Sequence, residues 1–244
     1  MRTRVIAGFF SVLIAGVAGT SATALAISYS GFVQNSSSTP VPGITAYQTE
    51  NAAVQSSPSL SDGSFTVPGL PSGTDFSLKF VDTNSSPTYA DGYSRNFNRT
   101  TNASGSTFTL STPAEISNWY TNTSPPITQN LNGGTIRGRV IDADTDTNIG
   151  GAKVTYTSSL GNTYPVYYYN GTTLKYVPGQ ATFANGRYMI FNVADGDTVT
   201  VTASKTDWTF SPATFNTHSG TLNVSVGNIL GNKQTVYLPL ILGN

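Results

Sequence analysis

The clearest structural signal in the chain is Thr198-Val199-Thr200-Val201-Thr202-Ala203, where polar and apolar residues alternate with a period of two. This alternation predicts a half-buried β-strand. Phe76, Leu78 and Phe80 alternate in the same way, and similar segments bounded by Gly, Pro, Asn and Asp recur along the chain. Convincing helical periodicity is nearly absent. We therefore predict an all-β fold made of antiparallel β-sandwich domains.

The alternating segments fall into two sets that keep the same order. The first set comprises Gly31-Phe32-Val33 and residues 40–47, 61–67 and 70–78. The second set comprises Gly138-Arg139-Val140 and residues 148–156, 184–190 and 193–201. The shared order indicates a duplicated domain. Gly31 and Gly63 are 32 positions apart, whereas Gly138 and Gly186 are 48 apart, so the second copy carries an insertion of about 16 residues, around positions 164–179.

Local signals predict turns and one helix. Asp62-Gly63 and Asn185-Gly186 are typical of tight hairpin turns with φ > 0 at both central positions. Thr112-Pro113-Ala114-Glu115 has the spacing of a capping box with Pro at the first helical position, which predicts a short helix over residues 113–120. Residues 121–134 are rich in Pro, Asn and Gly and are typical of a linker.

The N-terminus has the pattern of a secretory signal peptide over residues 1–26. Arg2 and Arg4 precede an apolar run, and Ala24-Leu25-Ala26 supplies a cleavage site. The run is about 15 residues long, which is short of the ~20 that span a bilayer. We expect a secreted or cell-surface protein with no transmembrane segment in the mature chain. The mature part then divides into a first sandwich over 27–120, the linker, and a second sandwich over 135–244.

The amino-acid composition restricts the classes of partner and of stabilising interaction that this chain can have. Charged residues are only 10% of the chain, against about 25% in typical domains. No basic patch is visible that would neutralise phosphates, so we expect no nucleic-acid partner. The chain contains no cysteine, which excludes disulfides and thiolate metal sites. Packing and sheet hydrogen bonds must stabilise the fold.

The second set of segments resembles the carboxypeptidase regulatory-like family, a transthyretin-like (Ig-like) sandwich also grouped with carbohydrate-binding-like folds. Gly138-Arg139-Val140 and residues 149–154 and 182–188 match the family's G-x-V, P-(I/V/L)-x-G-A-x-V and T-x-x-(D/N)-G-x-(F/Y) blocks. Trp208 stands at the aromatic place of its closing segment. The first copy is looser, because Pro68 interrupts the corresponding return strand. The motifs are structural, so the resemblance implies two tandem sandwiches and no particular activity.

Catalytic residues are scarce. A zinc peptidase of the kind that accompanies this domain in carboxypeptidases needs two His and a Glu. This chain has one His, His218, and two Glu, Glu50 and Glu115, neither of them near His218 in sequence. His218 lies in a polar segment that predicts a solvated turn, and no nucleophile elbow accompanies any serine. We therefore expect no enzymatic activity.

One acidic segment has the alternation of a cation-binding loop. Asp142, Asp144, Asp146 and Asn148 place oxygen atoms at every second position. The segment lacks Gly at the sixth position and Glu at the twelfth, both of which a wrapped calcium loop uses. A solvated turn is favoured over a calcium site, and no other cofactor is expected.

The insertion is rich in tyrosine. Five rings are candidates for stacking on sugars or for protein contacts: Tyr164, Tyr167, Tyr168, Tyr169 and Tyr176. On a strand, Tyr167 and Tyr169 share one face and Tyr168 takes the other, so we expect at least one face to be exposed. The alternative is a hairpin whose rings cover the sandwich. Trp208 is expected in the core, and Trp119 between the two domains.

The last apolar stretch is residues 235–242, in which Val236, Leu238, Leu240 and Leu242 share one face of a strand. It is expected to close the second sandwich. Pro239 confines such a strand to a sheet edge, so the alternative is self-assembly by strand addition to a neighbouring copy.

These observations favour a non-catalytic secreted or cell-surface protein with a structural, adhesive or assembly role and a protein or polysaccharide partner. The alternative is a carbohydrate-binding module that uses the tyrosine insertion. A third reading is an accessory domain pair for a separate enzyme.

Overall fold

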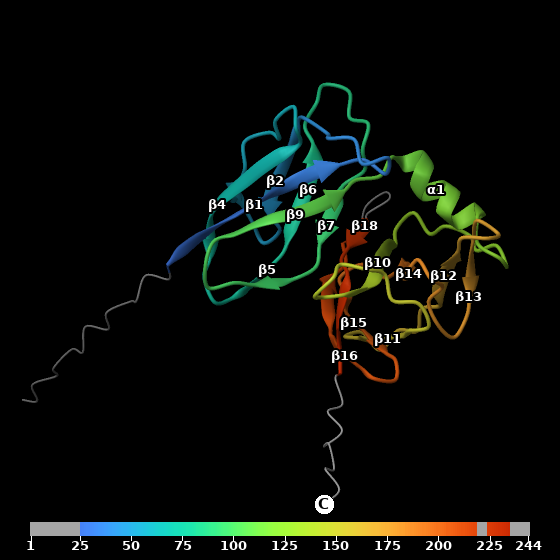
Figure 1. Cartoon of the computed structure of the whole chain (residues 1–244). Helices are drawn as coiled ribbons and strands as arrows, with labels where there is room; N and C mark the ends of the chain where they lie inside the picture. The colour runs from blue at the N-terminus through green and yellow to red at the C-terminus, as the bar shows by residue number, and fades with distance from the viewer. Residues whose placement is uncertain (1–24, 219–223, 235–244) are drawn as a thin grey trace, which may run out of the picture.

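The computed structural model describes residues 25–218 and 224–234, and its fold is all-β apart from one helix (Figure 1). The residues before position 25, with most of the predicted signal peptide, lie outside the described residues, as does the apolar C-terminal stretch. Within the described ranges there is no helix long and apolar enough to span a membrane.

The first sandwich packs two sheets around an aromatic core. Its strands are β1 (Ala26–Gln34), β2 (Ile44–Gln48), β3 (Asn51–Gln55), β4 (Ser64–Pro71), β5 (Asp75–Phe76), β6 (Leu78–Asp82), β7 (Gly92–Ser94), β8 (Phe97–Asn98) and β9 (Ala103–Thr109). β1 lies between β4 and β9 in one sheet, and β3, β2, β6 and β7 follow one another in the other. Phe76, Leu78 and Phe80 are all buried, as their alternation predicts. Phe80 packs on Phe108 of the opposite sheet with 4.5 Å between ring centroids.

The second sandwich repeats this plan. Its strands are β10 (Gly134–Asp142), β11 (Lys153–Ser158), β12 (Val166–Asn170), β13 (Lys175–Pro178), β14 (Arg187–Val193), β15 (Thr198–Ser204), β16 (Trp208–Ser211), β17 (Ala213–Asn216), β18 (Val224–Val226) and β19 (Ile229–Lys233). β11, β15 and β17 form one sheet, and β13, β12, β14 and β10 are consecutive in the other. Val199, Val201 and Phe215 are fully buried between the two sheets.

The predicted duplication is visible in the strand pairing. β1 pairs antiparallel with β4 and parallel with β9, and β10 pairs antiparallel with β14 and parallel with β18 and β19. The antiparallel pair β2–β6 of the first sandwich likewise corresponds to the antiparallel pair β11–β15 of the second. The parallel pairs depart from a purely antiparallel sandwich, because in each copy a late strand returns to lie beside the first.

The turns before β4 and β14 differ from the expected type. Gly63 and Gly186 have φ of 77° and 63°, but Asp62 and Asn185 do not have positive φ, so the prediction of φ > 0 at both central positions is wrong. Gly63 N donates to Leu60 O at 2.9 Å, which closes an ordinary turn just before the glycine. Each turn leads into a strand that pairs with the first strand of its sandwich, so only the glycine needs the left-handed conformation.

One sheet runs through both sandwiches. β18 pairs in parallel with β10 on one side and with β7 of the first sandwich on the other. The chain leaving β18 passes so close to β10 that a Cβ atom on Gly138 would lie 2.0 Å from the carbonyl oxygen of Gly227. A glycine is therefore required at this crossing, and Gly227 N in turn donates to Arg137 O at 3.2 Å. Backbone pairing, and not the linker alone, joins the two sandwiches.

The helix α1 (Pro113–Thr121) follows the first sandwich in the chain and lies over the β12–β13 hairpin (Figure 1). The capping box is confirmed: Glu115 N donates to the Thr112 hydroxyl, and Thr112 N donates to the Glu115 carboxylate at 2.8 Å. Ile116 and Tyr120 face downward into a buried cluster with Phe191 of β14. Because Tyr188 and Ile190 of the same strand point into the core of the second sandwich, β14 is buried on both faces.

Candidate functional site at the junction

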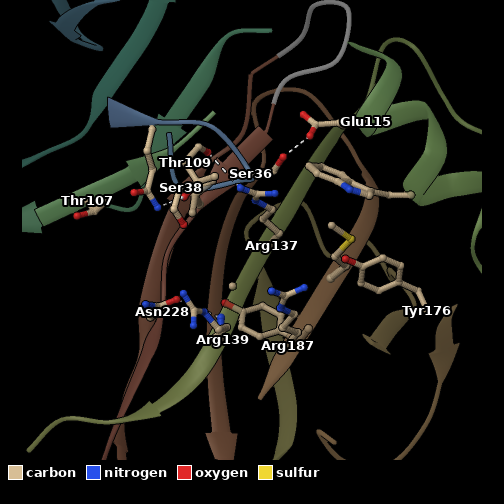
Figure 2. Close-up of a pocket in the computed structure, with 16 residues that line it drawn as sticks. Ser36, Ser38, Thr107, Thr109, Glu115, Arg137, Arg139, Tyr176, Arg187 and Asn228 are labelled. Atoms are coloured by element: carbon tan, nitrogen blue, oxygen red, sulfur yellow. Dashed lines mark hydrogen bonds between the residues drawn. The ribbon is translucent and has the colours of Figure 1, made fainter. Parts of the chain in front are cut away.

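A polar cleft lies where the two sandwiches meet, with a volume of about 310 Å³. Its floor comes from β10 and β14. Arg137 and Arg139 are two residues apart on β10 and so share one face of the strand. Arg187 of β14 is the direct partner of Arg139 across the ladder. Three arginines therefore converge on one cleft (Figure 2).

The opposite wall belongs to the first sandwich and to α1. It carries Ser36 and Ser38 of the β1–β2 loop, Thr107 and Thr109 of β9, and Glu115 and Trp119 of α1. Asn228, between β18 and β19, lies near Arg139 in Figure 2, and its side-chain oxygen accepts from the Arg139 backbone N at 3.1 Å. The lining is rich in hydroxyl groups and contains one carboxylate.

Arg137 is held in place by the first sandwich. Its Nη2 donates to the Thr109 carbonyl at 3.1 Å, and its guanidinium lies 4.9 Å from the centre of the Trp119 ring. Burial lowers the pKa of Arg137, Tyr176 and Glu115 oppose that shift, and the charges of Arg187 and Arg139 lower the pKa further. The charges of Arg187 and Arg139 thus act on Arg137 across the cleft floor.

Arg139 and Arg187 are exposed side chains directly opposite each other on neighbouring strands. Like charges in this position destabilise a sheet. Within residues 25–218 and 224–234, neither Arg139 nor Arg187 forms a salt bridge with a carboxylate. Arg187 lies 5.5 Å from the centre of the Tyr169 ring, a contact that supports the side chain without neutralising it.

Glu115 is committed to structure. One carboxylate oxygen accepts from Thr112 N in the capping box, and the other accepts from the Ser36 hydroxyl. The lining residues therefore offer no pair of carboxylates for acid–base chemistry. The arrangement is suited to binding an anion.

The tyrosines of the insertion are mostly inside the protein. The insertion forms the β12–β13 hairpin, which extends the sheet from β14. Tyr168 is buried in the core of the second sandwich, where its hydroxyl accepts from Val154 N at 3.0 Å. Tyr164 is also buried, and its hydroxyl donates to Asp197 at 2.8 Å.

The other face of the hairpin is covered by α1. Tyr167 and Tyr176 are buried with Phe191 and Tyr120, and only Tyr169 is half-buried. The expectation that one face would be exposed is therefore wrong, because a helix from the end of the first sandwich packs on that face. A ligand-binding role for the five rings stays a prediction, and Tyr176 is the one that lines the cleft.

The acidic segment forms a self-contained turn. Asp142 closes it: its side chain accepts from Asp144 N at 3.0 Å, and its carbonyl accepts from Asp146 N at 2.9 Å. Asn148 bridges back to Ile141. Over residues 25–218 and 224–234, no three acidic or histidine side chains gather as a metal site would require. Of the two alternatives for these four residues, the solvated turn stays the favoured prediction over a calcium site.

His218 and the tryptophans lie near the junction or the core. His218 is half-buried and stacks on Tyr93 of β7 at 4.4 Å, so its side chain is less solvated than its segment predicts. Burial lowers the pKa of His218, which Glu50 and Asp195 partly oppose. Trp119 packs between the sandwiches, as predicted. Trp208 is half-buried against the second core and stacks on Phe210 at 6.2 Å.

The arginine cleft was not anticipated from the sequence. Arg137 and Arg139 occupy alternate positions of a predicted strand, which is the signal that they share a face. Arg187 directly follows a predicted turn on the strand that should return beside it. Nothing local indicated that β9 and α1 would enclose these three side chains.

The comparisons with known proteins found matches only among solved structures. No protein-family model and no curated protein matches this chain. The resemblance to the carboxypeptidase regulatory-like family therefore stays a prediction.

Among solved structures, the shaft pilin SpaA of Lactobacillus rhamnosus GG is 12% identical, with 88% of this chain and 100% of the pilin covered and a TM-score of 0.31. The minor pilin GBS52 of Streptococcus agalactiae is also 12% identical, with 89% and 100% covered and a TM-score of 0.30. A streptococcal ancillary pilin is 15% identical, with 86% and 63% covered and a TM-score of 0.27. TM-scores this low carry no argument about what this chain does.

Proposed function

We propose that this chain is a non-catalytic structural protein that works outside the cell, at the surface or in a secreted assembly. The observation that carries the proposal is the sheet that passes through both sandwiches, in which β7 and β10 pair with the same strand, β18. Domains joined only by a flexible linker move independently. A shared sheet instead keeps the two domains in one orientation, which suits a load-bearing or spacing role.

Further contacts support a rigid unit. The segment between α1 and β10 is pinned to the second sandwich, where Ser124 N donates to the Tyr176 carbonyl at 2.8 Å. Asn130 N donates to the Asn192 side chain at 2.9 Å, and that side chain donates to the Thr128 carbonyl at 2.9 Å. The segment predicted as a linker is therefore held against the second sandwich.

The chemistry of the junction fits a role without catalysis. Its only lining carboxylate, Glu115, is used by α1 and the β1–β2 loop. His218 stacks on Tyr93 of β7, with 4.4 Å between the ring centroids. Export rests on the signal-peptide pattern of residues 1–26, which stays a prediction.

Immunogold electron microscopy of the native cells tests the proposal. Label is expected on structures outside the cytoplasmic membrane, either on the surface or on released assemblies. Label confined to the cytoplasm would contradict it, as would recovery of the chain solely as a dispersed monomer in the medium. The carbohydrate-binding alternative, in the form that uses the tyrosine insertion, is left with little exposed ring surface, since only Tyr169 is half-buried.

Deletion of residues 235–244, which leaves β19 intact, tests the role of the C-terminal segment. We expect thermal unfolding followed by circular dichroism to show a loss of about 2 kcal/mol, because Val236, Leu238, Leu240 and Leu242 would bury apolar surface as a closing strand. Unchanged unfolding combined with loss of a multimeric state in sedimentation velocity would instead assign the segment to a neighbouring copy.

A further inference from the structure

We propose that the junction cleft binds the carboxylate of an acidic sugar, with Arg139 and Arg187 as the residues that contact it. The inference stands on the cleft alone and does not depend on the structural role proposed above. It names a ligand class, a carboxylated sugar unit of an acidic polysaccharide, and two contact residues, Arg139 and Arg187, that lie outside the predicted tyrosine insertion.

The first argument is the concentration of charge. The whole chain has 12 Lys and Arg residues, and three arginines line this one cleft. Arg139 and Arg187 are direct cross-strand partners and have no salt bridge within the described residues. A sheet that places two like charges opposite each other loses stability. A bound anion between the two guanidinium groups would convert this repulsion into attraction.

The second argument is preorganisation. Arg137 is fixed by the Thr109 carbonyl and by Trp119, so its charge stays at the back of the cleft without a ligand. Arg187 rests against the Tyr169 ring. Side chains that are already ordered lose less entropy when a ligand binds. The floor that carries them is two paired strands, which is more rigid than a loop.

The third argument selects the ligand. The planar guanidinium fork matches carboxylates and phosphates. Around the arginines, Ser36, Ser38, Thr107 and Thr109 present hydroxyl groups, and Asn228 presents an amide, which are the partners that sugar hydroxyls use. The volume of about 310 Å³ is near the lower end for small-ligand pockets and suits a single sugar ring. A carboxylated sugar offers a carboxylate to the arginines and hydroxyl groups to the serine, threonine and asparagine side chains.

Isothermal titration calorimetry on the whole mature chain tests the proposal. Glucuronate and galacturonate are the probes, with glucose and galactose as neutral counterparts and with phosphate, sulfate and a short polyglutamate peptide as other anions. We expect at least one hexuronate to bind at least tenfold more tightly than its neutral sugar. The affinity should fall as salt rises, because the contact is between charges.

The variant Arg139→Gln with Arg187→Gln should lose at least tenfold in hexuronate affinity. Arg99→Gln is the matched control, because Arg99 is exposed and does not line the cleft, and it should bind as the parent does. The double variant should unfold at the same temperature as the parent or a higher one, since cross-strand repulsion is removed. Its loss of binding therefore cannot be ascribed to misfolding.

Four results would overturn the assignment. If hexuronates bind no better than neutral sugars, the cleft does not recognise the carboxylate. Phosphate or sulfate binding as tightly as the hexuronates would make the cleft a general oxyanion site. Polyglutamate binding in the absence of hexuronate binding would make the partner an acidic protein. Equal losses in Arg99→Gln and in the double variant would show that the cleft is not the site.

Discussion

The variant Phe191→Ala is expected to lose about 3–5 kcal/mol of unfolding free energy, the range for removing a fully buried phenylalanine. Phe191 has no exposed surface. Its ring meets Tyr120 of α1 at 4.7 Å and Tyr167 of the insertion hairpin at 5.5 Å, both edge to face. The cavity would therefore open between the helix and the sheet, and neither element can move in to fill it without giving up its own pairing or cap.

Urea unfolding monitored by tyrosine and tryptophan fluorescence gives the free energy. Phe183→Ala is the matched control, because Phe183 is 37% exposed and should cost well under 1 kcal/mol. Limited proteolysis adds a local readout, since cleavage within residues 121–134 should become faster when α1 loosens. A loss below about 1 kcal/mol in Phe191→Ala would show that α1 contributes little to the junction.

The variant Asp197→Ala is expected to lose about 3 kcal/mol, because the buried Tyr164 hydroxyl and two part-buried serine hydroxyls lose a charged acceptor at once. Asp197 is fully buried. Its carboxylate accepts from the Ser158 hydroxyl at 2.6 Å, the Tyr164 hydroxyl at 2.8 Å and the Ser159 hydroxyl at 3.0 Å. It thereby ties the loop after β11 to the start of β15.

This contribution should disappear in acid. Burial acts to raise the pKa of Asp197, but the hydrogen bonds from Ser158, Tyr164, Ser159 and Leu160 outweigh it and leave the pKa below its ordinary value. The unfolded chain therefore takes up the proton first as pH falls. The stabilisation is fully present above about pH 4, the ordinary range of an aspartate, and is lost as pH drops through the lower folded pKa.

Unfolding free energies of the parent and of Asp197→Ala, measured from pH 7 to pH 2.5, check both statements. Their difference should be constant near neutrality and shrink below about pH 4. Asp144→Ala, at an exposed position of the acidic turn, is the matched control and should unfold as the parent does at pH 7. A difference that grows in acid would contradict the direction of the pKa shift.

Asp82 makes the first sandwich acid-sensitive in the same direction. Its carboxylate accepts from Thr88 N at 2.7 Å, and its pKa is also lowered.

Much of the architecture was readable from short-range pattern. The alternation at Thr198–Ser204, the capping box at Thr112 and the positive φ of Gly63 and Gly186 each depend on a few neighbouring residues. Side-chain alternation, a helix cap and a turn are local properties, so the sequence can specify them without knowledge of distant contacts. The two sandwiches followed from the same signals repeated in order.

Only the tertiary structure shows which elements pack over each face of a sheet. Periodicity places Tyr167 opposite Tyr168 on a strand, but it does not say that α1 will cover the outer face and bury Tyr167. A run of apolar residues such as Tyr188 to Phe191 is the one local hint that both faces are covered. In the same way, Arg137 and Arg139 share a face by alternation, yet their cleft exists because β9 and α1 lie above it.

The joining of the two sandwiches shows the same division most clearly. Residues 224–226 alternate too briefly to name a partner, and β18 finds one on each side, β10 within its own sandwich and β7 far away in the chain. Which strands pair depends on the free energy of closing long loops and of packing whole sheets, to which local sequence contributes only propensities. The strands, turns and helix were therefore present in the sequence, whereas the shared sheet and the arginine cleft arise only when the folded layers meet.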